Sequence, residues 1–271
     1  MTDLVAATAD NKNNDEFLGH PKGLYVCFTT ELWERFSFYG MKYLLLLYLT
    51  KYHLFSDAAG LDVLGSYAGL VYALPVIGGL IADRYLGMRK SVLFGGILLS
   101  AGHLLMAVEG FKAINYAAGT VLTESLTLAS GEILAAGTML SEALTFRDTA
   151  ALNVFYFALA LIVMGVGYLK PNISTIVGKL YSKDDPRRDS GFTIFYMGIN
   201  IGSFTATLLC GWLGETFGWR YGFGAAGIGM IIGLISFSYG QRFLHGLTNR
   251  AGRRAFLAAG RLREAEGQDQ E

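Results

Sequence analysis

Acidic and basic side chains lie close together in an otherwise apolar stretch near the N-terminus. Within this run, which is long enough to cross a membrane as a helix, the charged residues are Glu31, Glu34, Arg35 and Lys42. At about 100° per residue, Glu31, Arg35 and Lys42 fall on one helical face. Lipid does not solvate charge, so we expect this face to look into a helix bundle or a wet cavity. Proton coupling would use such a cluster; an ion cluster that only fixes helix packing is the alternative.

A further cation lies in the fourth apolar stretch, directly before a proline. Lys170 precedes Pro171, which frees a carbonyl in the preceding turn of the helix. A lysine inside the membrane needs an acidic partner, and we expect that partner to be Glu31 or Glu34. A carboxylate–lysine pair with a mobile proton is the usual ingredient of proton coupling. Snorkelling of Lys170 to the membrane surface is the alternative.

Polar side chains elsewhere could contact a ligand or a closing gate. Asn200, in the fifth apolar stretch, either contacts a substrate or forms a hydrogen bond between helices. Tyr67, in the second stretch, offers a ring and a hydroxyl, but core packing explains it equally well. Asp83 and Arg84 lie in a short glycine-rich connection at a membrane edge. We expect them to pair across a closing cytoplasmic interface; a plain positively charged loop is the alternative.

These residues must be positioned by membrane helices, and six stretches are long enough to be such helices. The predicted spans are residues 24–49, 61–82, 90–108, 150–178, 190–214 and 219–239. The expected domains are an N-terminal tail (1–22), a six-helix bundle (23–240) and the start of a cytoplasmic central linker (241–271). Lysine and arginine concentrate in the connections on the side of the N-terminal tail. Both ends are therefore expected to face the cytoplasm.

The insertion between the third and fourth spans, residues 109–149, is ambiguous. It is moderately apolar but carries several charged residues, among them Glu124 and Arg147. Each charge at the bilayer centre costs about 2.5–3.5 kcal/mol on insertion scales. We therefore expect an external loop with one or two short amphipathic helices that lie against the membrane. A re-entrant pair is the alternative.

The composition favours an integral membrane protein and argues against other classes. Hydrophobic residues make up 52% of the chain and charged residues 16%, with a formal net charge of 0; soluble domains carry about a quarter charged residues. The lack of a basic excess argues against binding to nucleic acid. The four histidines and two cysteines show no spacing typical of a metal site. An intramembrane hydrolase is an alternative that would need a nucleophile and base, or metal ligands, deep in the spans. Among the histidines only His103 is clearly inside a span, and a lone interior histidine is more often packed than catalytic, so neither an enzyme nor a cofactor is expected.

Several motifs in the membrane spans occur together. They are Glu31-x-x-Glu34-Arg35-Phe36-x-x-Tyr39-Gly40, Lys170-Pro171-Asn172 and Phe195-Tyr196-x-x-Ile199-Asn200-x-Gly202-Ser203. The connection Gly79-x-x-x-Asp83-Arg84-x-x-Gly87-x-Arg89-Lys90 looks like the cytoplasmic motif of the major facilitator superfamily. Over about residues 20–240, the chain resembles the proton-dependent oligopeptide transporter (POT) family of that superfamily.

The resemblance implies an all-α membrane protein: the six-helix N-terminal bundle of a major facilitator transporter. It implies proton-coupled import of di- and tripeptides by alternating access across an inner or plasma membrane. The proton-coupling residues that it implies are Glu31, Glu34, Arg35 and Lys170. The substrate-binding residues that it implies are Arg35, Tyr39, Lys42, Tyr67, Lys170 and Asn200. Phe38 departs from a tyrosine often found in the family, and a phenylalanine cannot make the hydroxyl contact of that tyrosine.

The same resemblance sets the expected partners and the alternatives. The superfamily uses two six-helix bundles around a central cavity, so we expect a second six-helix half as a partner, beside small peptides, protons and the lipid bilayer. One alternative is the same fold with another small substrate, such as nitrate or amino acids. Another is a noncatalytic membrane subunit that pairs with a separate second half. Alone, the chain is expected to show no concentrative peptide uptake.

Overall fold

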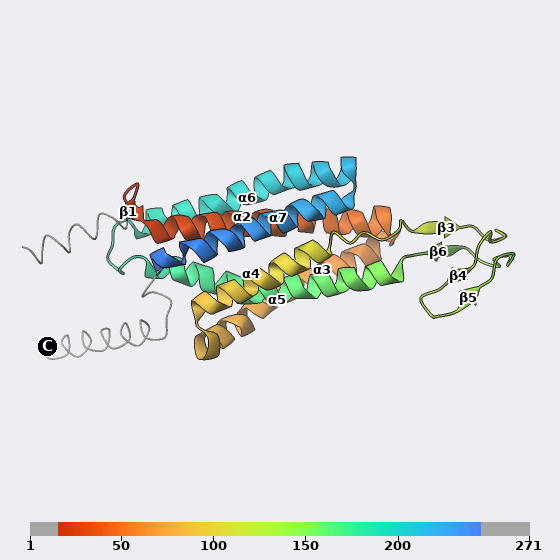
Figure 1. Ribbon diagram of the computed structural model, residues 1–271, viewed down its shortest axis with the longest axis horizontal. Helices are drawn as coiled ribbons and strands as arrows, with labels where there is room; N and C mark the ends of the chain where they lie inside the picture. Colours follow the sequence, from red (N-terminus) through yellow and green to blue (C-terminus); the bar gives the residue numbers. More distant parts are fainter. Residues whose placement is uncertain (1–15, 245–271) are drawn as a thin grey trace, which may run out of the picture.

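Six long helices lie side by side in a bundle, as the computed structural model shows for residues 16–244 (Figure 1). The helices are α2 (Lys22–Leu47), α3 (Asp57–Ile81), α4 (Met88–Leu105), α5 (Thr149–Lys179), α6 (Arg188–Phe217) and α7 (Trp219–Gly240). A π-helical turn extends α2 over Tyr48–Tyr52, and another extends α3 over Ala82–Leu86. Each long helix overlaps one of the predicted spans. The all-α fold class is confirmed.

Four of these helices, in the part of the chain that the structure describes, are long and apolar enough to cross a membrane: α3, α5, α6 and α7. Helix α2 differs because its apolar run contains charged residues, and α4 differs because Arg89, Lys90 and His103 lower its hydropathy. Both nevertheless pack inside the same bundle, α2 against α6 and α7, and α4 against α5 and α7. The six helices therefore form one multi-pass membrane unit.

Glycines allow the helices to approach closely at two crossings. A Cβ atom on Gly78 of α3 would lie 2.1 Å from the carbonyl oxygen of Gly167 in α5. A Cβ atom on Gly202 of α6 would lie 2.2 Å from the carbonyl oxygen of Leu32 in α2. Small residues at helix crossings are the usual device of membrane bundles. These contacts fix α6 against the charged helix α2, and α5 against α3.

Burial is uneven among the helices. Helix α5 is buried over much of its length, whereas α3 buries only Gly60, Tyr67, Val71 and Gly78. Helices α3 and α6 expose many large apolar side chains, among them Leu70, Tyr72, Val76, Ile77, Tyr196, Phe204, Leu208 and Trp212. Surfaces of this kind meet lipid or another protein.

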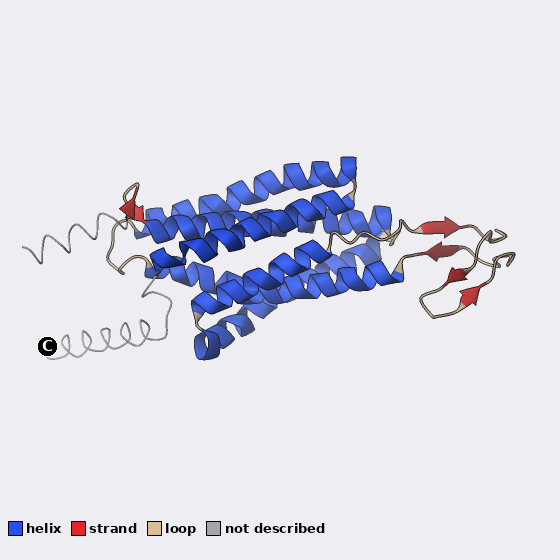
Figure 2. Ribbon diagram, viewed as in Figure 1, coloured by secondary structure: helices blue, strands red, loops and turns tan. Residues whose placement is uncertain are grey.

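The insertion between α4 and α5 contains strands, so the prediction of amphipathic helices is wrong. Its strands are β3 (Ile114–Tyr116), β4 (Leu126–Thr127), β5 (Ile133–Leu134) and β6 (Leu144–Phe146). Strand β3 pairs antiparallel with β6, and β4 with β5, and all four project beyond one end of the bundle (Figure 2). Glycines at positive φ (Gly119, Gly131 and Gly137) break any helical run here.

A second, smaller hairpin lies at the opposite end of the bundle. It consists of β1 (Glu16–Phe17) and β2 (His20–Pro21), directly before α2. The predicted N-terminal tail therefore includes ordered backbone at its end. Of the predicted linker over 241–271, Gln241–Leu244 forms a short 3₁₀ turn; the remainder lies outside the described residues.

Candidate functional site

One guanidinium and two carboxylates form a buried ionic cluster on α2. The Nε atom of Arg35 lies 3.1 Å from Oε1 of Glu31, one helical turn away, and it also donates to the carboxylate of the neighbouring Glu34. The side chains of all three residues are at most 5% exposed. The predicted charged face of this helix therefore points into the bundle.

The cluster is incomplete as a hydrogen-bonding unit. Oε2 of Glu31, Oε1 of Glu34 and Nη2 of Arg35 are buried without a hydrogen-bond partner among the described residues. Buried polar atoms without partners carry a large desolvation cost. Such atoms can accept a proton or bind the polar group of a ligand, which is the chemistry expected of a coupling site.

Aromatic rings lie around the guanidinium. Arg35 lies over the ring of Phe38, 5.0 Å from its centroid. Phe38 in turn contacts the rings of Tyr39 and Tyr67, with centroid distances of 5.2 and 6.3 Å. The hydroxyl of Tyr67 is also buried without a partner among the described residues. The rings of Tyr39 and Tyr67 therefore both contact Phe38, which lies against Arg35 and lacks a hydroxyl.

Lys170 does not form the predicted ion pair with a first-helix acid. Its side chain is half-buried, and its ammonium lies over the ring of Tyr72 on α3, 5.3 Å from the centroid. Among the side chains that the structure describes, no carboxylate lies within 4.0 Å of it. The reason is packing: α5 lies against α3 and α4 and has few contacts with α2.

The remaining predicted binding residues lie apart from the cluster. Lys42 is half-buried on α2. Asn200 is exposed on α6, and its amide donates to the carbonyl of Tyr196 at 3.2 Å, within its own helix. The structure thus shows neither the helix–helix hydrogen bond nor a contact with the Arg35 cluster for Asn200. Their roles in binding stay predictions.

The predicted gate residues lie at the end of α3. Asp83 belongs to its π-helical extension, but its side chain is outside the described residues. Arg84 is exposed and lies over the ring of Tyr85, 5.6 Å from the centroid. Pairing of these residues across an interface stays a prediction.

A cavity between α3 and α5 was not predicted from the sequence. It has a volume of about 470 Å³ and is mainly apolar. Its lining residues include Asp62, Ser66, Tyr67, Leu70, Tyr156 and Met164. Only Tyr67 was singled out in the sequence, because the other residues look like ordinary membrane-helix residues; no signal in the sequence indicated which of them would line a hollow.

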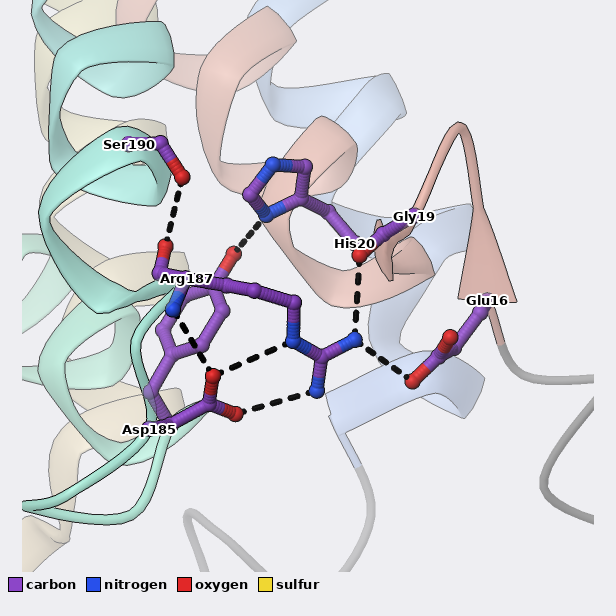
Figure 3. A network of polar contacts seen from close by, with 7 residues as sticks. Glu16, Gly19, His20, Asp185, Arg187 and Ser190 are labelled. Atoms are coloured by element: carbon purple, nitrogen blue, oxygen red, sulfur yellow. Dashed lines mark hydrogen bonds and ion pairs between the residues drawn. The ribbon is translucent and has the colours of Figure 1, made fainter.

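A second ionic network, also missed in the sequence, joins the N-terminal hairpin to the connection between α5 and α6 (Figure 3). Arg187 donates to both carboxylate oxygens of Asp185, to Glu16 at 2.9 Å and to the carbonyl of Gly19 at 3.0 Å. These hydrogen bonds from Arg187 hold the pKa of Asp185 below its usual value.

A hydrogen bond next to this network strengthens the same junction. Nδ1 of His20 and the hydroxyl of Tyr181 are 2.8 Å apart. Burial raises the pKa of Tyr181 to about 12, although the positive charge of Arg187 opposes the rise. The phenol therefore remains neutral at ordinary pH and can continue to share a hydrogen with the imidazole.

Comparisons with known proteins identify the family of the chain. Residues 89–250 match the family model described as the POT family. The di-/tripeptide transporter of Lactococcus lactis subsp. lactis is 38% identical over 239 residues, which is 85% of this chain and 40% of that protein. The peptide transporter YePEPT of Yersinia enterocolitica is 39% identical over 227 residues, which is 82% of this chain and 37% of that protein.

A solved structure shows the same arrangement of helices. The crystal structure of a peptide transporter POT in complex with sulfate aligns with a TM-score of 0.68 and 36% identity, over 92% of this chain and 46% of the solved chain. The chain thus spans less than half the length of these relatives. Because the family model matches more than half of the sequence, the chain belongs to the POT family.

Proposed function

We propose that this chain forms the N-terminal bundle of a secondary active transporter that imports di- and tripeptides together with protons. It would act by alternating access and not as an enzyme, with the proton as coupling ion and no other cofactor. The observation that carries the proposal is the buried cluster of Glu31, Glu34 and Arg35. In each of these residues one buried side-chain oxygen or nitrogen has no hydrogen-bond partner among the described residues. The names of the POT relatives support the choice of peptides.

The cluster suggests how a proton would act. A proton on Glu31 or Glu34 removes one of the two negative charges that hold Arg35. The guanidinium can then engage the carboxylate of a peptide next to the ring of Phe38, which Tyr39 and Tyr67 contact. Peptide and proton would shift the transporter between its states only by binding one state better than the other.

Further residues would complete the peptide site. Lys170 lies over Tyr72 in a contact that a peptide carboxylate can replace, because a carboxylate attracts an ammonium more strongly than a ring does. Lys42 and Asn200 would extend the site along α2 and α6. In this scheme Glu31, Glu34, Arg35 and Lys170 couple the proton to the peptide.

The proposed setting is the inner or plasma membrane, with the N-terminal hairpin at the cytoplasmic end. Asp83 and Arg84 would then lie on the cytoplasmic side, where they would act as a gate. The expected partner is a second six-helix half. The exposed apolar surfaces of α3 and α6 support a protein partner, since these helices bury few of their own side chains.

Glu34→Gln, made in the complete transporter that contains this chain, tests the coupling role. We expect loss of proton-driven peptide uptake, with peptide counterflow retained, because an amide cannot take up and release the proton. Uptake of labelled dipeptide into proteoliposomes, with and without a pH gradient, measures this. Glu215→Gln is the matched control, since Glu215 pairs with Lys51 on an exposed surface. Full proton-driven uptake by Glu34→Gln would overturn the proposal.

Lys170→Ala tests the binding role in the same assay. We expect a raised KM for dipeptide or a loss of proton dependence, because the site loses one of its cations. Lys51→Ala is the control, since it removes an exposed cation. Unchanged transport by Lys170→Ala would remove this residue from the site. Competition by nitrate or by free amino acids, in place of dipeptides, would point to another substrate class.

A further inference from the structure

The strand-containing insertion repeats its own sequence. Residues 114–128 read INYAAGTVLTESLTL, and residues 132–146 read EILAAGTMLSEALTF. At an offset of 18 residues, eight of these 15 positions are identical: Ala117/Ala135, Ala118/Ala136, Gly119/Gly137, Thr120/Thr138, Leu122/Leu140, Glu124/Glu142, Leu126/Leu144 and Thr127/Thr145. We call residues 114–146 the β module and its two halves unit 1 (114–128) and unit 2 (132–146).

The strand pairing places these units about a local twofold axis. In each cross-strand pair of β3–β6 and β4–β5, the two residue numbers sum to 260, from Ile114–Phe146 near the bundle to Thr127–Ile133 at the tip. Val121 and Met139 are the one pair of residues whose numbers both sum to 260 and differ by 18. The structure has an antiparallel bridge at that pair, which is therefore the centre of the symmetry.

The two units also share their backbone hydrogen bonds. Gly119 donates to the carbonyl of Leu140 at 2.7 Å, and its equivalent Gly137 donates to the carbonyl of Leu122 at 2.8 Å. The bonds from Leu122 to Thr138 and from Leu140 to Thr120 are both 2.9 Å. Gly119 and Gly137 have φ angles of +83° and +87°. One sequence thus adopts one conformation twice and pairs with itself.

The β module has a core that is separate from the bundle core. Leu122, Leu126 and Leu140 are buried, and Leu134 and Leu144 pack against them. Tyr116 and Phe146 complete this small cluster. The strands lie beyond the end of the helices (Figure 1). The side chains of the module therefore bury one another, not the helices.

Contacts with the helices begin just outside the module. Arg147 donates to the carbonyls of His53 and Leu54 at 2.7 and 2.9 Å. Its guanidinium also lies over the ring of Phe55, 4.8 Å from the centroid. Leu54 has a φ angle of +53°, which is costly for a leucine. Arg147 thus holds a strained corner between α2 and α3 against the start of α5.

We propose that the β module is a tandem duplication of one β unit that folds as a separate domain, inserted between α4 and α5 and dispensable to the helix bundle. Arg147, which lies next to the module, is the residue that braces the corner between α2 and α3. The module that the bundle can lose therefore ends at Phe146, and the contacts that hold the corner between α2 and α3 begin at Arg147.

Excision of the module tests the boundary. In the full chain, residues 114–146 are replaced by Asn-Gly, which joins Ala113 to Arg147; the ends are close because Ile114 and Phe146 are cross-strand partners. We expect amide hydrogen exchange in α2–α7 and at residues 53–55 to change by less than twofold. Faster exchange across the helices would overturn the proposal. This readout needs no transport, so it is independent of the proposed function.

Matched substitutions test the duplication without any deletion. We expect Leu122→Ala and Leu140→Ala to speed exchange within residues 114–146 at least tenfold, and to equal extents within a factor of two, because each removes the same buried group. The pair Gly119→Ala and Gly137→Ala is expected to behave alike, since both sites have positive φ. A clear difference within either pair, or faster exchange in the helices, would contradict a symmetric, separate domain.

Arg147→Ala tests the bracing role. We expect at least tenfold faster exchange at residues 53–55 and no change within the β module. Adding Leu54→Gly is expected to restore protection, since glycine adopts positive φ without strain. Unchanged exchange at the corner in Arg147→Ala, or failure of Leu54→Gly to restore it, would overturn this part of the proposal.

Discussion

The protein contains two arginine-centred ionic sites, one inside the bundle and one at its N-terminal end. Arg35 is nearly inaccessible and contacts two carboxylates through one nitrogen, while Nη2 has no partner among the described residues. Arg187 is 41% exposed, and its Nε, Nη1 and Nη2 atoms all donate hydrogen bonds. All three guanidinium nitrogens of the exposed Arg187 therefore donate hydrogen bonds, whereas the buried Arg35 leaves Nη2 without a hydrogen-bond partner among the described residues.

The difference separates a structural site from a candidate functional one. In water, an incomplete ion pair costs little, because solvent fills the vacant positions. In the bundle, the same vacancies are expensive, so a cluster there is poorly explained as a device for stability alone. This difference supports the proposed coupling role of the Arg35 cluster, whereas the Arg187 network attaches the N-terminal hairpin.

The largest effect is expected from Arg35→Met, which leaves two carboxylates buried without a cation. Breaking a buried ion pair on one side costs about 3–5 kcal/mol. We expect a loss of this size in the free energy of unfolding of the chain in detergent, measured by denaturant titration. Arg187→Met is the matched control at the exposed site. A loss below about 1 kcal/mol would show that water already reaches the cluster.

Removing all three charges sharpens the same comparison. For the triple variant Glu31→Gln, Glu34→Gln and Arg35→Met, we expect recovery of most of the stability that Arg35→Met loses. Replacing a whole buried ionic group is often neutral, because the desolvation cost disappears together with the attraction. The same titration measures it. A triple variant as unstable as Arg35→Met would mean that the cluster is needed for folding.

A smaller effect is expected from Arg187→Ala. Exposed ion pairs contribute about 0–1 kcal/mol each, so global stability should change little. Locally, residues 16–21 should exchange their amide hydrogens several times faster, since Arg187 also holds the carbonyl of Gly19. High salt should reproduce this effect in the unaltered chain, because the Debye length falls to about 3 Å at 1 M. Salt-independent exchange would argue against an ionic attachment.

The helices could be predicted from the sequence because membrane spans need long apolar runs. The charged face of α2 was predicted for the same reason: charges in such a run must avoid lipid. The position of Lys170 could be predicted from the sequence in this way, but its partner could not. Its partner depends on which helices touch, and α5 packs against α3, so the ammonium meets Tyr72 instead of an acid. The apolar periodicity of a single helix does not indicate which other helices it contacts.

The insertion shows a different limit of sequence reasoning. Its moderate hydrophobicity suggested helices on a membrane, but the apolar side chains bury one another in a small β core. Positive-φ glycines recur at the same place in each unit, and they were the signal against helices. The Arg187 network could not be predicted, since Glu16 and Arg187 are far apart along the chain and only the packed ends of the bundle bring them together.

The smallest effect is expected from acid titration of Asp185. Hydrogen bonds from Arg187 lower the pKa of Asp185 from its ordinary value of 3.8, so the folded state holds the carboxylate more strongly than the unfolded state does. The stabilisation is therefore fully present above about pH 4 and is lost as the pH falls through the lowered pKa. We expect protection of the backbone amides of residues 16–21, corrected for intrinsic exchange rates, to be constant from pH 7 to 5 and to fall below pH 4. Asp185→Asn should flatten this dependence, because an amide does not titrate. An unchanged acid response in Asp185→Asn would show that protonation of Asp185 does not control the attachment of the hairpin.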